Sequence, residues 1–325
     1  VLREGRAVER SGIDIRSLTG SIESDSVRIK IPDFSLQTVF SILKLQAFVP
    51  WSAIDSVNPI DFMSVDMSGS IGKKDVMLIA GEMPKNIQRY YPDTSLQVRL
   101  GANGNIADIK LEKLEVSLPR AFHLDLTGSV QSVINEQLRT GNFHCDIHTY
   151  DMDFVAGILP SSMQNRVRIP DNMRLTGRLD INKGLYSTDM IFRESRGKIH
   201  LSGNYNLFRD SYEAYLKVDS LEPVHFMPDD SIMCLNAFVR AKGRGTDIYR
   251  ASTWAELEGK VSDICYGNSS VSDISLSGNL KNNHLLAEII SAYPLIKGRI
   301  SIDGDVKKKE VNGMLIVDVD TLDLY

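Results

Sequence analysis

Three polar residues, His144, Asp146 and His148, occupy alternate positions of one stretch, and side chains of these types bind zinc. In a β-strand, alternate side chains point to the same face, so all three would lie together. They would be ~6.6 Å apart along the strand, which is too far for three ligands to meet one ion through bonds of ~2 Å. We therefore interpret them as part of a polar outer face and expect no metal site.

The cysteines Cys145, Cys234 and Cys265 are odd in number and far apart, and none forms a Cys-x-x-Cys pair. This spacing predicts neither a disulfide framework nor a zinc knuckle, and it leaves the redox compartment open. The sequence has no Gly-x-Ser-x-Gly elbow, no His-Glu-x-x-His and no glycine-rich phosphate or dinucleotide loop. We therefore expect no catalytic residues, no enzyme activity and no cofactor.

The 325 residues carry a formal net charge of −5, and the sequence contains no basic stripe. Binding to nucleic acid depends largely on Lys and Arg side chains that neutralise phosphates, so nucleic acid is not an expected partner. The charge run Lys307–Glu310 is interpreted as a solvated hairpin turn. The sequence has no run of ~18 apolar residues, so no membrane span is expected in it, and its two ends suggest an interior fragment of a longer protein.

A short phrase recurs along the chain, in which a glycine stands in step with alternating apolar residues. It is found around Gly20, Gly69, Gly128, Gly177, Gly203, Gly259, Gly278 and Gly304. Because alternate residues of a strand share a face, each glycine is expected on the apolar face of a strand. Repetition at intervals of ~20–50 residues is typical of an extended array of similar strands.

Other segments alternate in the same way without a central glycine. They are Leu96–Leu100, Leu114–Leu118, Phe143–Ile147, Ala214–Val218, Val239–Ala241 and Leu315–Val319. Turn residues separate the segments, at Ala102–Asn105, Asn182–Gly184, Arg209–Ser211, Tyr266–Asn268 and Lys281–Asn283. Short helices are predicted at Gln131–Leu138, Asp151–Leu159 and Ala287–Tyr293. We expect a single elongated β body over residues 1–325, with a possible joint near 160–170.

Glycines inside strands weaken them, so a series of glycines in one register favours a sheet that must curve at that level. The predicted fold is a long, curved antiparallel sheet forming a half-pipe, with rows of Leu, Ile and Val above and below a row of glycines and an apolar groove. The curvature glycines are Gly69, Gly128, Gly177, Gly203, Gly259, Gly278 and Gly304. The predicted groove residues are Leu126, Val130, Leu175, Leu179, Leu201, Val239, Leu257, Leu276, Ile302 and Val317. The alternative is a β-sandwich in which the same side chains pack in a closed core.

The glycine phrase in a strand-rich chain resembles the AsmA-like proteins, and in particular the TamB-like translocation and assembly module proteins of Gram-negative bacteria. The likeness is carried by Tyr150–Phe154, Ile158–Pro160, Ile169–Pro170 and Met173–Gly177, where an acidic segment, a Leu-Pro and a Leu-x-Gly strand follow in the family's order. The resemblance implies a "β-taco" half-pipe in the periplasm. It also implies an inner-membrane anchor outside this fragment, phospholipid acyl chains in the groove and an outer-membrane barrel protein as partner.

Three functions therefore remain open. The leading hypothesis is a periplasmic lipid conduit, because acyl chains exposed to water cost ~0.8 kcal/mol per CH₂ and an apolar groove would cover them. The second is an assembly factor that binds nascent outer-membrane β-barrel proteins along exposed sheet edges. The third is a structural β-repeat module of a surface protein.

Overall fold

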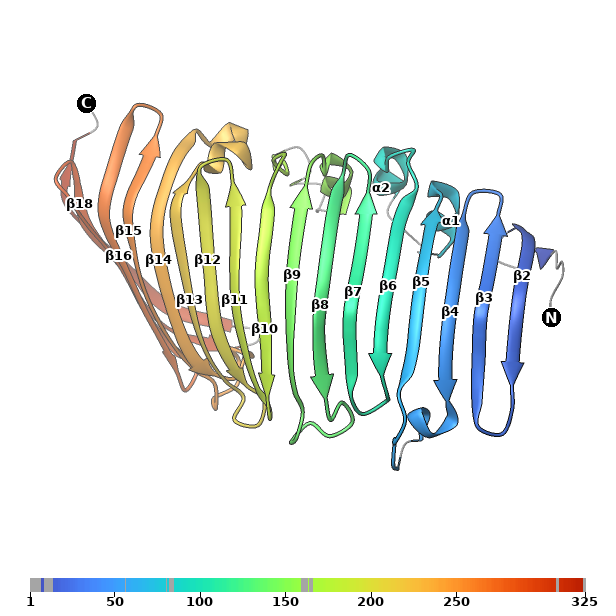
Figure 1. The fold of residues 1–325 in the computed structure, drawn as a ribbon. Helices are drawn as coiled ribbons and strands as arrows, with labels where there is room; N and C mark the ends of the chain where they lie inside the picture. The colour runs from blue at the N-terminus through green and yellow to red at the C-terminus, as the bar shows by residue number, and fades with distance from the viewer. Residues whose placement is uncertain are drawn as a thin grey trace. The chain divides into compact units, whose positions relative to one another are not determined.

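The computed structural model describes residues 7–8, 14–55, 57–79, 81, 85–158, 163, 166–307 and 310–323. The chain divides into two compact units, Val1–Lys183 and Gly184–Tyr325. Each unit is built mainly from antiparallel strands, and strands that follow one another in the sequence lie side by side (Figure 1). The predicted all-β, antiparallel fold class is therefore confirmed.

The first unit contains β1 to β10, and each described strand pairs with the next along the chain. The strands are β1 (Ala7–Val8), β2 (Asp14–Ser24), β3 (Arg28–Thr38), β4 (Ile42–Pro50), β5 (Met63–Ile71), β6 (Leu96–Gly104), β7 (Ile109–Leu118), β8 (Phe122–Gln131), β9 (Thr140–Thr149) and β10 (Arg174–Asn182).

The second unit contains β11 to β19, which pair in the same consecutive way. The strands are β11 (Leu185–Glu194), β12 (Gly197–Asn206), β13 (Ser211–Leu221), β14 (Ile232–Arg244), β15 (Trp254–Tyr266), β16 (Ser269–Lys281), β17 (His284–Tyr293), β18 (Ile296–Lys307) and β19 (Glu310–Leu322). Every glycine phrase of the sequence falls within a strand of one unit or the other.

Neither unit forms a β-sandwich in its described part. Within each unit the strands belong to a single sheet, and no second sheet of that unit packs on either face. Buried apolar side chains are correspondingly few in these ranges: Ala53, Tyr91, Leu118, Ala121, Phe154, Met173, Val218 and Leu280. Most apolar side chains of the strands are half-buried or exposed.

Short helices lie at the ends of strands rather than across the sheets. They are α1 (Lys73–Ile79), α2 (Lys85–Tyr90) and the 3₁₀ helices η1 (Trp51–Ile54), η2 (Asp153–Ile158), η3 (Pro223–His225) and η4 (Pro228–Asp230). Figure 1 shows α1 and α2 near the ends of the strands that they connect. None of the helices in the described ranges has the length and apolar character needed to cross a bilayer.

Of the three predicted helices, one is confirmed and two are wrong. Helix η2 occupies most of Asp151–Leu159, although Leu159 lies outside the described residues. The helix predicted at Ala287–Tyr293 is wrong, because this segment belongs to β17, where Ala287 and Ile289 pair with the apolar face of β16. The helix predicted at Gln131–Leu138 is also wrong. This segment forms successive turns, in which the Asn135 N–H donates to the carbonyl oxygen of Ser132.

Four of the five predicted turns contain a turn of the structure, but the one at Ala102–Asn105 is misplaced. Ala102–Gly104 belongs to β6, and the chain reverses at Asn105–Asp108, where the Asn105 N–H donates to the carbonyl oxygen of Asp108. Asn282 and Asn283, between β16 and β17, have φ values of 54° and 63°, the paired left-handed conformation of a tight hairpin. Of the charge run at Lys307–Glu310, Lys308 and Lys309 lie outside the described residues. The predicted joint near 160–170 also falls partly on residues outside the description, and the two compact units divide at Lys183. A single body over residues 1–325 stays a prediction.

Candidate functional site

The strand register of the second unit aligns apolar side chains into continuous rows that cross the sheet. The row that we call the central row consists of Met190, Leu201, Leu216, Val239, Gly259, Leu276, Ile289, Ile300 and Val317, from β11 to β19. A second row runs two residues away on the same face, through Thr188, Gly203, Ala214, Ala241, Leu257, Gly278, Ala287, Ile302 and Leu315. All six groove residues predicted in this unit lie in these two rows.

The first unit has the same arrangement over β2 to β10. One row contains Leu18, Leu36, Leu43, Gly69, Val98, Val116, Leu124, Ile147 and Leu175. Leu126 and Leu179 lie in the next two rows, and Val130 lies in a fourth. All four groove residues predicted in this unit therefore share one face of their own sheet.

The exposure of these residues differs between the units. Leu126, Val130, Leu175 and Leu179 are all half-buried. In the second unit Val239 and Leu276 are half-buried, whereas Leu201, Leu257, Ile302 and Val317 are exposed, Leu201 by 38% and Ile302 by 41%. A contiguous set of exposed large apolar side chains is uncommon on a protein surface and usually marks a site of interaction.

The opposite face of the second sheet is charged. Salt bridges join neighbouring strands there: Arg240 with Glu213 (2.5 Å), Lys242 with Glu256 (2.7 Å), Lys260 with Asp273 (2.8 Å) and Arg299 with Glu288 (3.2 Å). The hydrogen bond from Lys260 lowers the pKa of the Asp273 carboxyl. Most of these side chains are about half exposed, so this face is in contact with solvent.

A cavity of about 340 Å³ lies over β15 to β18 in the second unit. Its lining includes Leu257, Leu276, Leu285, Ile289, Ile300 and Ile302, so it belongs to the apolar face. In the first unit, a larger hollow of about 630 Å³ has a lining that includes Asp33, Lys44, Asp66 and Arg99. Hollows are therefore found beside charged side chains as well as on the apolar face.

The glycines do not form a single row, and this part of the curvature prediction is wrong. In the second unit, Gly259 lies in the central row, Gly203 and Gly278 lie in the second row, and Gly304 pairs with Leu285 in a third. In the first unit, Gly69, Gly177 and Gly128 each lie in a different row. The phrase determines the face of the sheet on which a glycine lies. It does not determine which row of cross-strand partners the glycine belongs to.

The space around the glycines, which decides whether a Cβ would fit, also differs from site to site. A Cβ on Gly69 would lie against the side chain of Leu43 and 2.8 Å from the carbonyl oxygen of Ile42. A Cβ on Gly128 would meet the ring of Phe143 at 2.5 Å. At Gly278 the nearest atom would be 3.8 Å away, which is ordinary contact. Gly69 and Gly128 therefore make room for a large neighbour, whereas Gly278 does not.

One end of the apolar face in the first unit is closed by a small core that the sequence interpretation did not contain. Tyr91, Leu118, Ala121 and Phe154 are buried together, and Val76, Met77, Leu96, Phe122, Met152 and Val155 pack against them. The rings of Tyr91 and Phe154 meet edge to face at 5.5 Å. Burial raises the pKa of the Tyr91 hydroxyl.

Helix α1 is held in place by a buried carboxylate. Asp75 accepts hydrogen bonds from the hydroxyl groups of Thr38 and Ser41, and all three residues are buried. Ser41 Oγ also accepts a hydrogen bond of 3.0 Å from the Gly72 N–H. The sequence does not indicate this cluster, because Thr38 and Ser41 lie more than 30 positions before Asp75 in the chain.

The polar triplet of β9 is engaged in contacts that differ from one residue to the next. Asp146 accepts hydrogen bonds from Arg174 on β10, which lower the pKa of the carboxyl. The ring of His148 lies 4.5 Å from that of Tyr150. His144 pairs across strands with Thr127 and Arg178. The structure therefore places these side chains on the charged face of the sheet.

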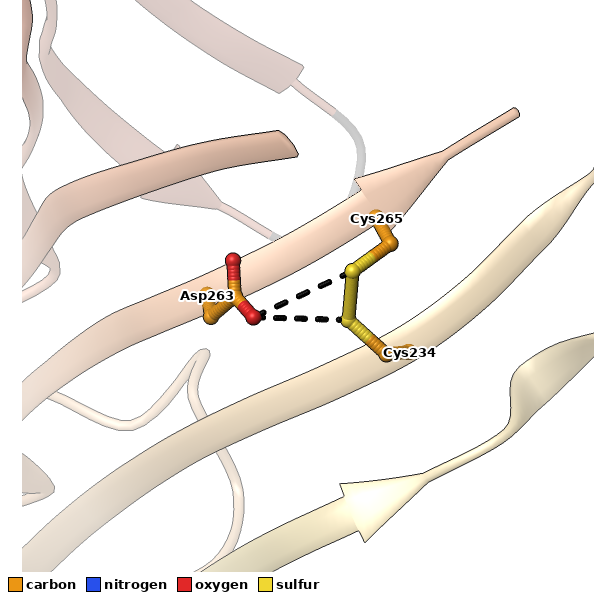
Figure 2. Close-up of side chains that lie close together, drawn as sticks. All are labelled: Cys234, Asp263 and Cys265. Carbon is orange, nitrogen blue, oxygen red and sulfur yellow. Dashed lines mark hydrogen bonds between the residues drawn. A yellow bond between two sulfur atoms is a disulfide. The ribbon is translucent and has the colours of Figure 1, made fainter. Parts of the chain in front are cut away.

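Two of the three cysteines require a correction. Cys234 on β14 and Cys265 on β15 are directly paired across the strands with their Cα atoms 4.9 Å apart, and they form a disulfide (Figure 2). Asp263 Oδ2 lies 3.5 Å from Cys234 Sγ and 3.8 Å from Cys265 Sγ. The spacing in the sequence concealed the pair because strand register, not spacing, brings the two residues together. Cys145 is a free thiol.

No protein-family model matches the chain, and neither a curated protein nor a solved structure matches it.

Proposed function

We propose that this chain is a segment of a periplasmic lipid conduit, in which the apolar face covers phospholipid acyl chains on their way between the inner and outer membranes. The observation that carries the proposal is the continuity of the apolar rows across each sheet, with no second layer of the same unit over them in the described residues. The resemblance of the glycine phrase and of Tyr150–Gly177 to the AsmA-like and TamB-like proteins also supports the proposal. An inner-membrane anchor outside this fragment and an outer-membrane barrel partner belong to the same proposal.

The physical argument rests on the exposed apolar side chains. Covering apolar surface contributes roughly 25 cal/mol per Å², so Leu201, Leu257 and Ile302 would each gain from contact with a hydrocarbon chain. Because successive rows lie on one face, an acyl chain could keep such contact from strand to strand. The headgroup needs no dedicated charged site, since it can stay in water.

The test is lipid that co-purifies with the protein from cells, measured by native mass spectrometry. Leu201→Glu and Leu276→Arg place a charge in the central row and are expected to remove the lipid. Ser202→Glu and Ser277→Arg are matched controls, because each changes the neighbouring residue on the opposite face. Lipid loss in the Leu variants alone supports the conduit. Absence of lipid from the wild-type protein, or equal loss in the controls, contradicts it.

A photo-crosslinker gives an independent test of the face. At Leu126 or Ile302 it is expected to capture acyl chains, whereas at Asp125 or Asp303, one residue away on the opposite face, it is expected to capture none. Capture at all four positions would show that lipid adsorbs without using the apolar face.

The assembly factor remains a second candidate because of strand β19. Among the described strands of its own unit it pairs only with β18, and Leu315, Val317 and Val319 are exposed along it. An unpaired edge of this kind can accept an added strand. Addition of an unfolded outer-membrane barrel protein would then slow amide exchange in β19 and not in β15. If neither lipid nor an unfolded barrel protein binds, the structural module is favoured.

A further inference from the structure

A cluster of two carboxylates and one imidazole lies at one end of the second unit, outside the apolar rows described above. Glu194 ends β11, Glu222 directly follows β13, and His225 is the last residue of η3. One ligand atom from each residue can be chosen so that all lie within 4.8 Å of one another. From these three residues we infer a binding site for a divalent first-row transition metal ion, with Zn²⁺ as the expected occupant.

The topology explains why residues so distant in sequence meet. Strands β11 and β13 are both antiparallel to β12, so they run in the same direction. Their carboxyl-terminal ends therefore lie side by side. They are ~9.6 Å apart, two strand spacings, which side chains of Glu and His can bridge. Helix η3 then brings His225 back toward these strand ends.

The turn of η3 aligns two of the three ligands. The His225 N–H donates to the carbonyl oxygen of Glu222 at 3.0 Å, and the Phe226 N–H donates to that of Pro223 at 2.9 Å. Residues three apart in a 3₁₀ turn lie one above the other, so Glu222 and His225 project to the same side. The ring of Phe226 lies 6.3 Å from that of Phe192 on β11, which keeps the turn next to Glu194.

The distances fit a metal ion. His225 Nδ1 is 2.8 Å from Glu194 Oε1 and 3.4 Å from Glu222 Oε2. Ligands bound tetrahedrally at 2.0–2.1 Å are ~3.4 Å apart, so a shift of a few tenths of an ångström would admit the ion. Zinc binds both His nitrogen and carboxylate oxygen, and sites with three protein ligands keep a fourth position for water.

Glu194 supplies an independent observation that points to a ligand. Its side chain is only 4% exposed, and its Oε2 atom is buried without a hydrogen-bond partner in the described structure. Buried carboxylate oxygens are normally paired, because removing them from water is unfavourable. The imidazole contacts only Oε1, and a divalent ion between the three side chains would also neutralise the second carboxylate.

The site is both supported and accessible. Gly197 pairs with Glu194, and a Cβ there would lie 2.9 Å from the Cα of Leu221, so the end of β12 packs closely beside the buried carboxylate. The His225 side chain is 42% exposed, which leaves an entry path from solvent. A bound ion would tie η3 to the end of β11.

The other groups of possible ligands fit less well. Cys234 and Cys265 lie close to Asp263, but their sulfur atoms are bonded to each other. His284 contacts Asp303 through Nε2 and Asp305 through Nδ1, so the two carboxylates lie on different sides of the ring and cannot share an ion with it. His284 therefore offers a matched control, as an exposed histidine with two carboxylate partners.

The experiment is calorimetric titration of the chelator-treated chain with Zn²⁺ at pH 7.4, with Co²⁺ and Mg²⁺ in parallel. One Zn²⁺ ion per chain is expected, with little binding of Mg²⁺, which prefers six oxygen ligands. Bound Co²⁺ should give the visible absorption of a four-coordinate ion. Glu194→Gln, Glu222→Gln and His225→Ala are each expected to weaken binding at least about tenfold, and His284→Ala is expected to leave it unchanged.

The inference is overturned if the wild-type chain shows no saturable Zn²⁺ binding, since the cluster is then only a set of contacts between an imidazole and two carboxylates. Zn²⁺ binding that survives His225→Ala, or that His284→Ala removes, overturns it as well. Should Glu194→Gln fail to fold, the more exposed Glu222 and His225 variants decide the question. Lipid binding is not involved in any of these outcomes, so the result is independent of the proposed conduit.

Discussion

The two units use the same pattern of strands but leave their apolar faces in different conditions. In the first unit the predicted groove residues are half-buried, and one end of the face is closed by the core around Leu118 and Phe154. In the second unit most of them are exposed, and exposure is greatest on β19. The comparison teaches that alternation selects the face of a strand, whereas burial depends on what is packed over that face.

The largest difference is expected between buried and exposed leucines. Leu118→Ala should destabilise the first unit by about 2–5 kcal/mol, because Leu118 is fully buried and its loss leaves a cavity. Leu315→Ala should change the second unit by less than about 0.5 kcal/mol, since Leu315 is 64% exposed. The two tryptophans, Trp51 and Trp254, lie in different units, so fluorescence of single-Trp variants during urea unfolding separates the effects. A large loss at Leu315 would mean that the face is covered.

Reduction is expected to affect only the second unit. The disulfide closes a sequence separation of 31 residues, and its removal should cost that unit about 2–4 kcal/mol. The first unit has only the thiol of Cys145 and should be unaffected. Hydrogen exchange with and without reductant, or in Cys234→Ser with Cys265→Ser, would show faster exchange in β14 and β15 but not in β6 and β7. Equal acceleration in both units would contradict this separation.

The glycines give a smaller contrast between the same two faces. Gly69→Ala should destabilise the first unit by about 1–3 kcal/mol, because the new Cβ meets Leu43 and Ile42. Gly278→Ala should leave the second unit unchanged or stabilise it by up to about 1 kcal/mol, since the site has room and the unfolded chain loses freedom. Denaturant midpoints measure both. A destabilising Gly278→Ala would show that this glycine is needed for shape.

The smallest expected effects are opposite in their pH dependence. Hydrogen bonding to Asp305 raises the pKa of His284, so its contribution to the second unit is full below pH ~6.5 and is lost as pH rises through the folded pKa. Arg174 lowers the pKa of Asp146, so that contribution to the first unit is present above pH ~3.9 and is lost as pH falls through the folded pKa.

Both shifts can be read by NMR titration of the assigned side chains. Asp305→Asn should bring the pKa of His284 down, and Arg174→Gln should bring that of Asp146 up. If either variant leaves its titration unchanged, the corresponding pair is not formed in solution.

Much of the fold could be predicted because each strand carries its own evidence. The spacing around Gly128 or Gly278 predicts which residues share a face, and the turn residues Asn282 and Asn283 indicate where the chain reverses. The sequence of Ala287–Tyr293 predicts a helix wrongly, because its apolar residues fit either period over so short a length. Only pairing with β16 decides in favour of a strand.

What could not be predicted depends on register between strands. The number of residues in each hairpin and bulge determines which residues of neighbouring strands meet. It places Gly259 and Gly278 in different rows, pairs Cys234 with Cys265, and brings Glu194 close to His225. A bulge shifts β14 against β15 close to the disulfide, because Asn236 pairs with Asp263 whereas Ala237 pairs with Val261. No local pattern in the sequence announces such a shift.

The consecutive pairing of strands has a consequence for how each sheet can form and change in length. In the described part of each unit, a strand pairs with the strands before and after it, and most are joined by short turns. Contacts therefore close small loops, and the sheet can begin to form at any hairpin. Duplication or loss of two adjacent strands would disturb a single junction. The extent of such a sheet is thus an adjustable quantity, set by hairpin number rather than by a core that must be rebuilt.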